Sequence, residues 1–515
     1  MQDLDNPTVA ETKRFLELYT GIQSYKDEVD ANCNITQAPF GFRFKPSSVR
    51  SIYDADYLES QQKAGIGLNT AEKAYREFCN QKIGWRNRIR YECTPADDKL
   101  GAWRKRQINR SKFEFGAQRD QFFIHAPLMF ELAEGCSVGC WFCAFSASKL
   151  AKILPYSPEN IQLWRGVLHA GMDVIGPAAR WSTDYFATDP LDNPEHEEFC
   201  RDFHEIMGMW PQTTTAIAHK DVERVRALLL EAREAGCRVN RFSVITTKNL
   251  ERIHNAFTAE ELRDVEIIAQ SQDSTFLKAK AGRYIDTAQK SKKIEDREAE
   301  KNVIAFEDKF SHEEAAKLAA EMEDQAGSIC CVSGFLVNMV ERSIKLISPV
   351  GADERWPLGM IVYDQAEFKD DKDFPKVLQT MQNRIKLKLD MDDIVQFNTK
   401  AKVELLEDGF QLKSASTLVS FTKKGCEDVL RYIGELISEG TKSANEICLL
   451  SFYKTSKPMQ FAMGILQELF NGGFINEDPK IAPKTYYKDG GPQMIGELNE
   501  EVKTAREMID STVGK

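Results

Sequence analysis

Three cysteines within a short loop constrain this chain more than any other feature of its sequence. They lie in Cys136-Ser-Val-Gly-Cys140-Trp-Phe-Cys143, directly after the apolar run Ala126-Pro-Leu-Met-Phe-Glu-Leu-Ala133. That run predicts a buried strand that ends just before the cysteines. Thiolates are soft ligands that suit zinc or an iron–sulfur cluster. Three of them can hold three irons of a [4Fe–4S] cluster and leave the fourth iron open to a small molecule.

The alternative for this motif is a zinc site with a fourth ligand elsewhere in the chain. Zinc sites usually combine two C-x2-C pairs. The sequence contains no second pair, because the remaining cysteines are scattered except for the adjacent Cys330 and Cys331. The spacing therefore favours the cluster.

Composition and charge exclude several classes of protein. The net charge of −11 argues against a nucleic-acid binder, which would carry a basic face. No apolar run reaches the ~18 residues that a membrane helix needs, and the N-terminus lacks the basic and apolar regions of a signal peptide. Twelve cysteines in a chain this long do not indicate a disulfide framework. We expect a cytoplasmic protein without nucleic-acid or membrane partners.

Alternating strand and helix patterns after residue 125 predict an α/β fold with a parallel sheet covered by helices. The strands are expected at 185–189, 213–218, 241–246 and 265–270, and the helices at 159–169, 195–208, from Asp221 to Gly236, and around 259–263. The predicted organisation is a helical N-terminal region (1–125), a β/α region (126–389) with a charged insertion (272–327) and a cysteine-bearing hairpin (329–349), a small C-terminal module (390–478) and a polar tail (479–515).

The hairpin carries the adjacent pair Cys330 and Cys331. Side chains alternate between the two faces of a strand, so only one of the two thiols can face the interior of the sheet. Cys330 would share a face with Val332 and Leu336, which suits packing under helices, whereas Cys331 would share the face of Ser333. This pattern favours Cys331 as the chemically active thiol, with Cys330 as the alternative.

The C-terminal module reads as three strands followed by three helices. The strands are expected at 402–406, 410–412 and 417–421, and Ser443-Ala-Asn-Glu446 matches a helix-capping box. This order resembles the winged-helix leader-recognition element of peptide-maturation systems. Such modules bind the leader of a precursor peptide as an added strand, although the same module can serve only as a packing or dimer surface.

Together these residues resemble the proteusin-type radical S-adenosylmethionine (SAM) peptide epimerases of ribosomal peptide maturation. The resemblance rests on the cysteine loop with Phe142, the stretch Phe186-Ala-Thr-Asp-Pro-Leu-Asp-Asn-Pro194, the hairpin Val332-Ser-Gly-Phe-Leu-Val-Asn-Met339 and the C-terminal module. It implies a partial (β/α)6 radical SAM barrel. It also implies a [4Fe–4S] cluster on Cys136, Cys140 and Cys143, with SAM on the open iron.

The resemblance further implies the reaction and its partners. Enzymes of this family invert Cα of L-residues: a 5′-deoxyadenosyl radical removes the hydrogen atom and a cysteine thiol returns one from the other face. The thiol here would be Cys331 or Cys330. SAM would be held near Phe142, by Thr188 and Asp189, and by Arg241 and Ser243. The Thr188-Asp189-Pro190 stretch departs from the Gly-Gly-Glu common in the family, and Asp189 has a turn cap as its alternative role. Partners would be a precursor peptide and an electron donor such as flavodoxin or ferredoxin.

Two other functions remain open at this point. One is a radical SAM enzyme that makes thioether or carbon crosslinks, but such enzymes commonly carry a cysteine-rich C-terminal region, and only Cys426 and Cys448 follow residue 331. The other is a non-catalytic peptide-binding protein with a structural metal.

Overall fold

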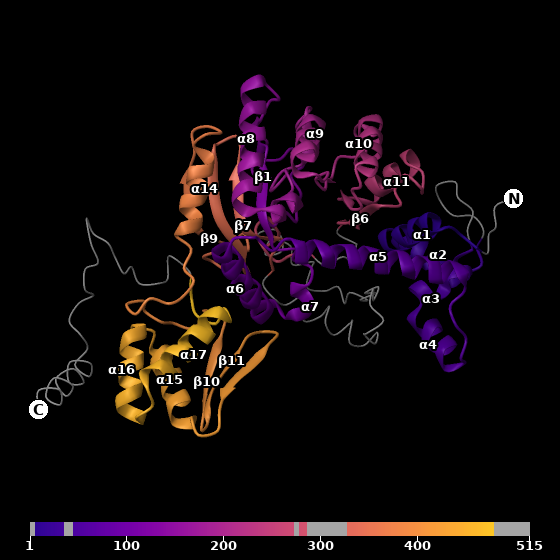
Figure 1. The fold of residues 1–515 in the computed structure, drawn as a ribbon. Coiled ribbons are helices and arrows are strands. Elements are labelled where there is room, and N and C mark those ends of the chain that lie inside the picture. Colours follow the sequence, from indigo (N-terminus) through magenta and orange to yellow (C-terminus); the bar gives the residue numbers. More distant parts are fainter. Residues whose placement is uncertain (1–5, 36–44, 272–277, 286–326, 478–515) are drawn as a thin grey trace, which may run out of the picture.

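The computed structural model describes residues 6–35, 45–271, 278–285 and 327–477. Within them the chain is a mixed α/β structure with several sheets (Figure 1). Helices α8 to α11 lie along one side of the sheets, α5 runs across the other side, and the C-terminal module sits apart at one end (Figure 1). Most of the predicted insertion and the polar tail lie outside the described residues.

Helices fill the described residues before the first strand. These are α1 (Val9–Gly21), α2 (Gln23–Ala31), α3 (Arg50–Tyr53), α4 (Ala55–Lys63), α5 (Thr70–Glu92), α6 (Asp98–Phe115) and α7 (Ala117–Asp120). A capping box between Thr8 and Glu11 fixes the start of α1. The apolar face of α1, with Phe15 and Leu18, packs against Phe242 in the same buried cluster. The first helix therefore covers a sheet formed more than two hundred residues later.

The four-stranded sheet has the order β1-β7-β8-β9. Its strands are β1 (Ala126–Glu131), β7 (Val332–Asn338), β8 (Ser343–Pro349) and β9 (Met360–Glu367). β1 and β7 are parallel, and the register shifts by one residue between Ala126 and Leu128. A Cβ atom on Gly334 would lie 2.1 Å from the Pro127 carbonyl oxygen, so glycine allows the two backbones to meet at this irregular point. The predicted first strand and hairpin are confirmed.

The second sheet is parallel, with the order β4-β5-β6. Its strands are β4 (Thr214–Thr215), β5 (Asn240–Val244) and β6 (Val265–Ala269). The covering helices are α8 (Pro158–Ile175), α9 (His196–Met207), α10 (Val222–Glu234) and α11 (Thr247–Ala256). The predictions of α8, α9, α10 and of the three strands are confirmed, since each observed element overlaps its predicted range.

Two local predictions are wrong. Residues 185–189 form no regular strand: Tyr185 makes a single bridge to Glu131, and the left-handed backbone of Ala187 (φ 56°) ends the extended conformation. Residues 259–263 are a turn, and the helix between the last two parallel strands is α11. Here Thr246 caps α11 through its side chain, which is a start signal earlier in the chain than the one predicted.

The four-stranded sheet and the parallel sheet are not joined by continuous strand pairing. They are linked through the segment around Tyr185. The Glu131–Tyr185 bridge links this segment to β1, and the Tyr185 hydroxyl lies 2.8 Å from the Thr214 hydroxyl of β4. Among the described residues the strand pairings do not close into a barrel. The partial barrel therefore stays a prediction, while the mixed α/β class is observed.

The C-terminal module contains the predicted strands and helices in the predicted order. They are β10 (Lys402–Leu406), β11 (Gly409–Lys413), β12 (Leu418–Thr422), α15 (Glu427–Glu439), α16 (Ala444–Thr455) and α17 (Met459–Asn471). The capping box of Ser443 and Glu446 is present. Helix α6 connects this module to the four-stranded sheet, because Arg110 donates to the Ser348 hydroxyl and Asn398 donates to Glu114.

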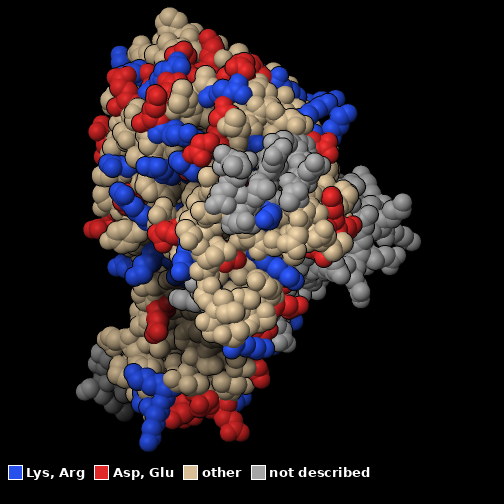
Figure 2. All heavy atoms as spheres, turned by 90° about the vertical axis from the view of Figure 1, so that its right-hand side faces the viewer, with Lys and Arg blue, Asp and Glu red and all other residues tan. Residues whose placement is uncertain are grey.

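The face of the molecule in Figure 2 carries acidic and basic side chains mixed together, without a continuous basic patch. None of the helices in the described ranges has the length and apolar character needed to cross a membrane.

We expect Gly334→Ala to lower the free energy of unfolding by about 3 kcal/mol, because the added Cβ meets the Pro127 backbone rather than a movable side chain. The matched control is Gly84→Ala within α5, where the new Cβ meets nothing within 4 Å and helix propensity should raise stability by about 0.5–1 kcal/mol. Urea unfolding of the two variants measures both effects. Equal stability of Gly334→Ala and the parent chain would contradict the close contact of β1 and β7.

Candidate functional site

The cysteine loop, residues 134–150, follows the end of β1 and is closed at its base by a short pair of strands. β2 (Ala133–Glu134) pairs with β3 (Lys152–Ile153), and the Cys136 amide donates to the Ser148 carbonyl at 2.9 Å. Gly135 fits here because a Cβ would lie 2.3 Å from the Lys149 oxygen. The fold thus holds the three cysteines on one compact loop, each half-buried.

The sulfur atoms of the loop are close enough to influence one another. Burial, followed by the adjacent thiols of Cys136 and Cys143, raises the pKa of Cys140 to about 12. Backbone amides of Val138 and Ala147 donate to the sulfurs of Cys136 and Cys143 at 3.5 and 3.4 Å. Such amide donors stabilise cluster thiolates and tune their potential.

The spread of the three sulfurs bears on which metal the loop suits. A single zinc ion with Zn–S bonds of about 2.3 Å holds its thiolates roughly 3.8 Å apart. In the described part of the chain, the three sulfurs do not gather within 4.8 Å of one another. A cluster distributes its thiolates over separate irons and therefore needs a wider set. In the structure the three sulfurs are therefore not gathered as ligands of one zinc ion would be.

Arg283 holds the outer side of the cysteine loop. Its backbone amide donates to the Cys143 carbonyl at 3.0 Å, and its guanidinium donates to the carbonyls of Cys140 and Ala147 at 3.0 and 2.5 Å. Next to it, a Cβ on Gly282 would lie 2.2 Å from the Ala144 oxygen. No local sequence pattern indicates this contact, since Arg283 lies in the segment predicted to be a solvated insertion.

Thr188 and Asp189, which the resemblance places near SAM at the end of the second strand, lie next to the cysteine loop. The Thr188 hydroxyl donates to the Gly135 carbonyl at 2.6 Å. The Asp189 carboxylate accepts from the Thr215 hydroxyl and the amides of Ala216 and Leu191. Burial raises its pKa to about 6, against these donors. Both carboxylate oxygens are engaged within the protein, which is the turn-capping role considered for this residue.

Arg241 and Ser243 share the face of β5 that lies opposite the helices. Their side chains are half-buried, while Phe242 and Val244 on the other face of the strand are buried with residues of α1 and α11. Arg241 pairs with Glu266 of β6 at 2.7 Å. Burial would lower the pKa of Arg241, but Glu266 reverses this and raises it. The sequence analysis missed Glu266, although the alternation in β6 places it on this same face.

Cys331 belongs to the same group of side chains. Burial raises its thiol pKa, and the nearby Arg241 opposes that shift. Burial raises the pKa of the Tyr185 hydroxyl above its usual value. Nearby Arg241 lowers this pKa, and Cys331 raises it. We call Tyr185, Thr214, Arg241, Glu266 and Cys331 the inner-face cluster.

The face assignment that favoured Cys331 is partly wrong. Val332 and Leu336 pack with Met129 and Phe186 on the inner side of the sheet, and it is Phe335, with Val337, that packs under the helices. The alternation itself is kept, since Val332 and Leu336 still share one face and Phe335 and Val337 the other; which face lies under the helices depends on tertiary packing. Even so, the two thiols differ in environment: Cys330 is fully buried and Cys331 half-buried.

The cysteine loop and Cys331 begin at opposite ends of the β1–β7 pair. The Ala126 amide at the start of β1 donates to the Cys331 carbonyl, whereas the loop follows the end of β1, about 17 Å along the strand. The loop then returns over the inner face, since Phe145 stacks at 4.4 Å on Phe186. Phe145, Phe186 and Cys331 border one apolar cluster, so the site extends from the loop to Cys331.

Phe142 lies within the cysteine loop, half-buried and edge-on to Trp141 at 5.4 Å. Of the predicted residues, the fold therefore gathers two groups. The first is the loop with Phe142, Thr188 and Asp189. The second is Cys331 with Arg241, beside which Ser243 follows on β5.

The uncharacterized protein y4wI of Sinorhizobium fredii (strain NBRC 101917 / NGR234) is 32% identical to this chain over 482 residues, which cover 92% of the chain and 88% of that protein. The chain belongs to the same family as y4wI. No protein-family model matches the sequence, and no solved structure matches it either.

We expect Arg283→Ala to speed the loss of iron from the anaerobically reconstituted protein on exposure to air. The change removes two charged hydrogen bonds to the loop, each contributing about 1.5–3 kcal/mol. Iron release is followed by chelator absorbance, with the exposed Arg252→Ala on α11 as the matched control and a Cys136/Cys140/Cys143→Ala chain as the iron-free reference. Identical release rates for Arg283→Ala and the control would contradict a role of Arg283 in holding the cysteine loop. Iron in the reference chain would contradict binding of the cluster by the three cysteines.

Proposed function

We propose that this protein is a radical SAM epimerase that converts L-residues of a ribosomally made precursor peptide to D-residues. The observation that carries the proposal is the three-cysteine loop at the end of the first strand, folded over an inner face that leads to a second, separate thiol. Inversion of Cα requires reactive groups on two sides of one carbon atom. A cluster loop at one end of the β1–β7 pair and Cys331 at the other supports that arrangement.

Cys136, Cys140 and Cys143 are the residues that would hold the cluster. Amides of the loop donate to two of the sulfurs, and Gly139 leaves open space where any other residue would place a Cβ. With SAM bound, the cluster supplies a carbon radical that takes the Cα hydrogen atom. Thr188 and Arg283 hold the loop in place.

Cys331 would return the hydrogen atom. Burial keeps its thiol pKa above the usual value, so the group stays protonated near neutral pH, which is the form that donates a hydrogen atom. The transfer breaks the S–H bond, forms the new Cα–H bond and leaves a sulfur radical. One electron from the external donor and one proton restore the thiol.

Cys331→Ala should still cleave SAM and abstract hydrogen, because the cysteine loop is unchanged, but it should give no D-residue. In deuterium oxide the thiol exchanges with solvent, so the parent enzyme should place one deuterium at Cα of each inverted residue. Mass spectrometry of the hydrolysed, chirally derivatised peptide measures both outcomes.

The adjacent Cys330→Ala is the matched control and should keep epimerising, since Cys330 is fully buried in an apolar cluster. The reverse result would move the donor role to Cys330. Full activity in the double variant would rule out a thiol donor from this hairpin. Crosslinked peptide without D-residues would favour the alternative enzyme class.

The C-terminal module offers a place for the precursor's leader. Its sheet has the order β10-β11-β12, so β12 has a strand neighbour only on its β11 side in the described chain. A cavity of about 860 Å³ borders β12 at Val419 and Phe421, together with Ile465 of α17 and Lys105 of α6. An unpaired strand edge beside an apolar groove is the setting in which an extended peptide adds as a further strand.

We expect Val419→Glu to weaken binding of the labelled leader by about ten-fold or more, equivalent to about 1.4 kcal/mol, because a charge enters the apolar groove. Val403→Glu is a matched control. Val403 and Val419 both pair with Leu412, on opposite edges of the sheet. Val419 lines the cavity and Val403 does not. Fluorescence anisotropy with a labelled leader of a candidate precursor peptide measures the affinities. Equal affinities for the two variants would place the leader elsewhere.

A further inference from the structure

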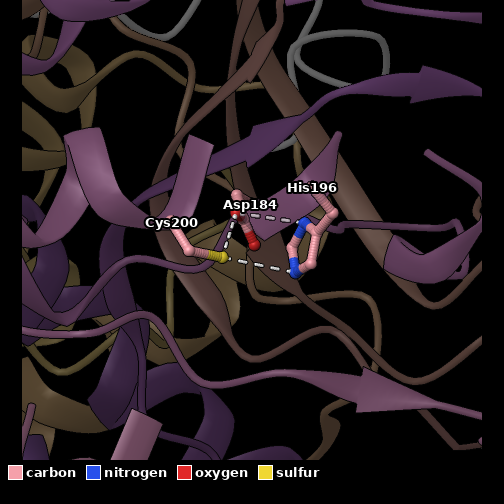
Figure 3. Close-up of side chains that lie close together, drawn as sticks. All are labelled: Asp184, His196 and Cys200. Carbon is pink, nitrogen blue, oxygen red and sulfur yellow. Dashed lines mark hydrogen bonds and ion pairs between the residues drawn. The ribbon is translucent and has the colours of Figure 1, made fainter. Parts of the chain in front are cut away.

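A second group of potential metal ligands lies outside the proposed active site. It comprises Asp184, His196 and Cys200, whose side chains meet in the interior (Figure 3). His196 and Cys200 are one turn apart on α9 and share one face of that helix. Asp184 comes from the segment between the short helix η3 (Pro177–Trp181) and the Tyr185 bridge. No more than 1% of any of the three residues is exposed.

The separations between these side chains are close to those of a tetrahedral metal site. The Cys200 sulfur lies 3.4 Å from His196 Nε2 and 3.6 Å from Asp184 Oδ2. One ligand atom from each residue lies within 4.8 Å of the others. For zinc, bonds of about 2.3 Å to sulfur and 2.0–2.2 Å to nitrogen and oxygen put neighbouring ligands roughly 3.3–3.6 Å apart.

Among the described residues, the Asp184 carboxylate has one side-chain hydrogen-bond donor, the weakly donating Cys200 thiol at 3.6 Å. Its Oδ1 atom is buried and has no hydrogen-bond partner on another described residue. Its Oδ2 atom lies 3.6 Å from His196 Nδ1, which is too long for an N–H···O hydrogen bond. A buried carboxylate without strong donors is costly unless it is neutralised or coordinates a cation.

Neighbouring groups do not supply that cation. Around the site lie Trp210, Ala232 and Cys237, which form a small buried cluster with Cys200. Burial raises the pKa of the Asp184 carboxyl. His196 is the largest influence after burial and lowers this pKa, whereas Glu197 raises it. A divalent ion would complete the group electrostatically, because one thiolate, one carboxylate and a neutral imidazole balance its two positive charges.

We propose that Asp184, His196 and Cys200 bind one zinc ion, with Asp184 Oδ1 available as a fourth ligand atom. Binding releases the thiol proton of Cys200 to solvent and leaves one ring nitrogen of His196 on the metal. The ligand set of sulfur, nitrogen and oxygen is one that zinc accepts. A closed, buried site of this kind is structural: it ties the segment before Tyr185 to α9 and so fixes one side of the inner-face cluster.

A nucleophilic triad made of the same three residues is not supported, because their side chains are buried. In such a triad the base stands between the nucleophile and the orienting acid. His196 does lie between the other two, with Nε2 3.4 Å from the Cys200 sulfur and Nδ1 3.6 Å from Asp184 Oδ2 (Figure 3). No more than 1% of any of the three residues is exposed, however, so a substrate has no access to the Cys200 sulfur.

The test uses the full chain with Cys136, Cys140 and Cys143 changed to Ser, so that the cysteine loop binds no metal and the proposed epimerase chemistry plays no part. We expect the purified protein to contain one zinc ion per chain by elemental mass spectrometry. Adding Cys200→Ser or His196→Asn should remove it, whereas adding Cys448→Ser, a buried cysteine in the C-terminal module, should leave it in place.

Cobalt exchange into the same chain, with Cys136, Cys140 and Cys143 changed to Ser, covers the case in which a ligand variant fails to fold. A thiolate-to-cobalt charge-transfer band that persists with Cys448→Ser supports the site. A folded chain that holds neither zinc nor cobalt would overturn it, because the three side chains would then form only a hydrogen-bonded group. Full zinc content in folded Cys200→Ser and His196→Asn chains would overturn it as well.

Discussion

The parallel contact between β1 and β7 is the constraint on which the rest of the site depends. β1 ends in the cysteine loop, and β7 begins directly after Cys331. Their pairing brings together parts of the chain about two hundred residues apart, and it does so through a backbone contact at Gly334 and Pro127 that tolerates no side chain. Both thiol groups of the proposed reaction are positioned by this one pair of strands.

Helix α6 carries the connection from that sheet to the C-terminal module. Arg110 is buried, donates to the Pro349 carbonyl at 2.6 Å and pairs with Glu114. Arg106 pairs with Glu477 at 2.7 Å and donates to the Lys386 carbonyl. Buried arginines stay in place only when their donors are satisfied, so α6 fixes the module through specific polar contacts. The groove beside β12 is lined in part by this same helix.

The segment 183–189 lies between the two proposed metal centres. Asp184 faces α9 and the buried His196 and Cys200, Tyr185 reaches the inner-face cluster, and Thr188 supports the cysteine loop. The left-handed backbone at Ala187 separates these roles within a few residues. A regular strand could not direct its side chains in this way, because it offers only two faces.

By itself, the sequence determined most of the helices and strands and the position of the cysteine loop. Local spacing of apolar residues, caps and glycines was enough for α8 to α10, for the hairpin and for the C-terminal module, and the three cysteines stand within one loop. The H-x3-C spacing of His196 and Cys200 on a predicted helix also indicates that the two side chains share one face. No sequence pattern indicates Asp184, the third residue of the proposed zinc site.

Only the tertiary structure decided what depends on contacts between distant residues. Val332 and Leu336 share one face of β7, as alternation predicts, but packing against Met129 and Phe186 rather than against helices decided where that face points. Arg283 reached the cysteine loop from a segment without any local signal, and Asp189 turned its carboxylate to Thr215 and Ala216 rather than outward. Local patterns encode which element forms, whereas register and long-range polar contacts are set by the packing of the whole chain.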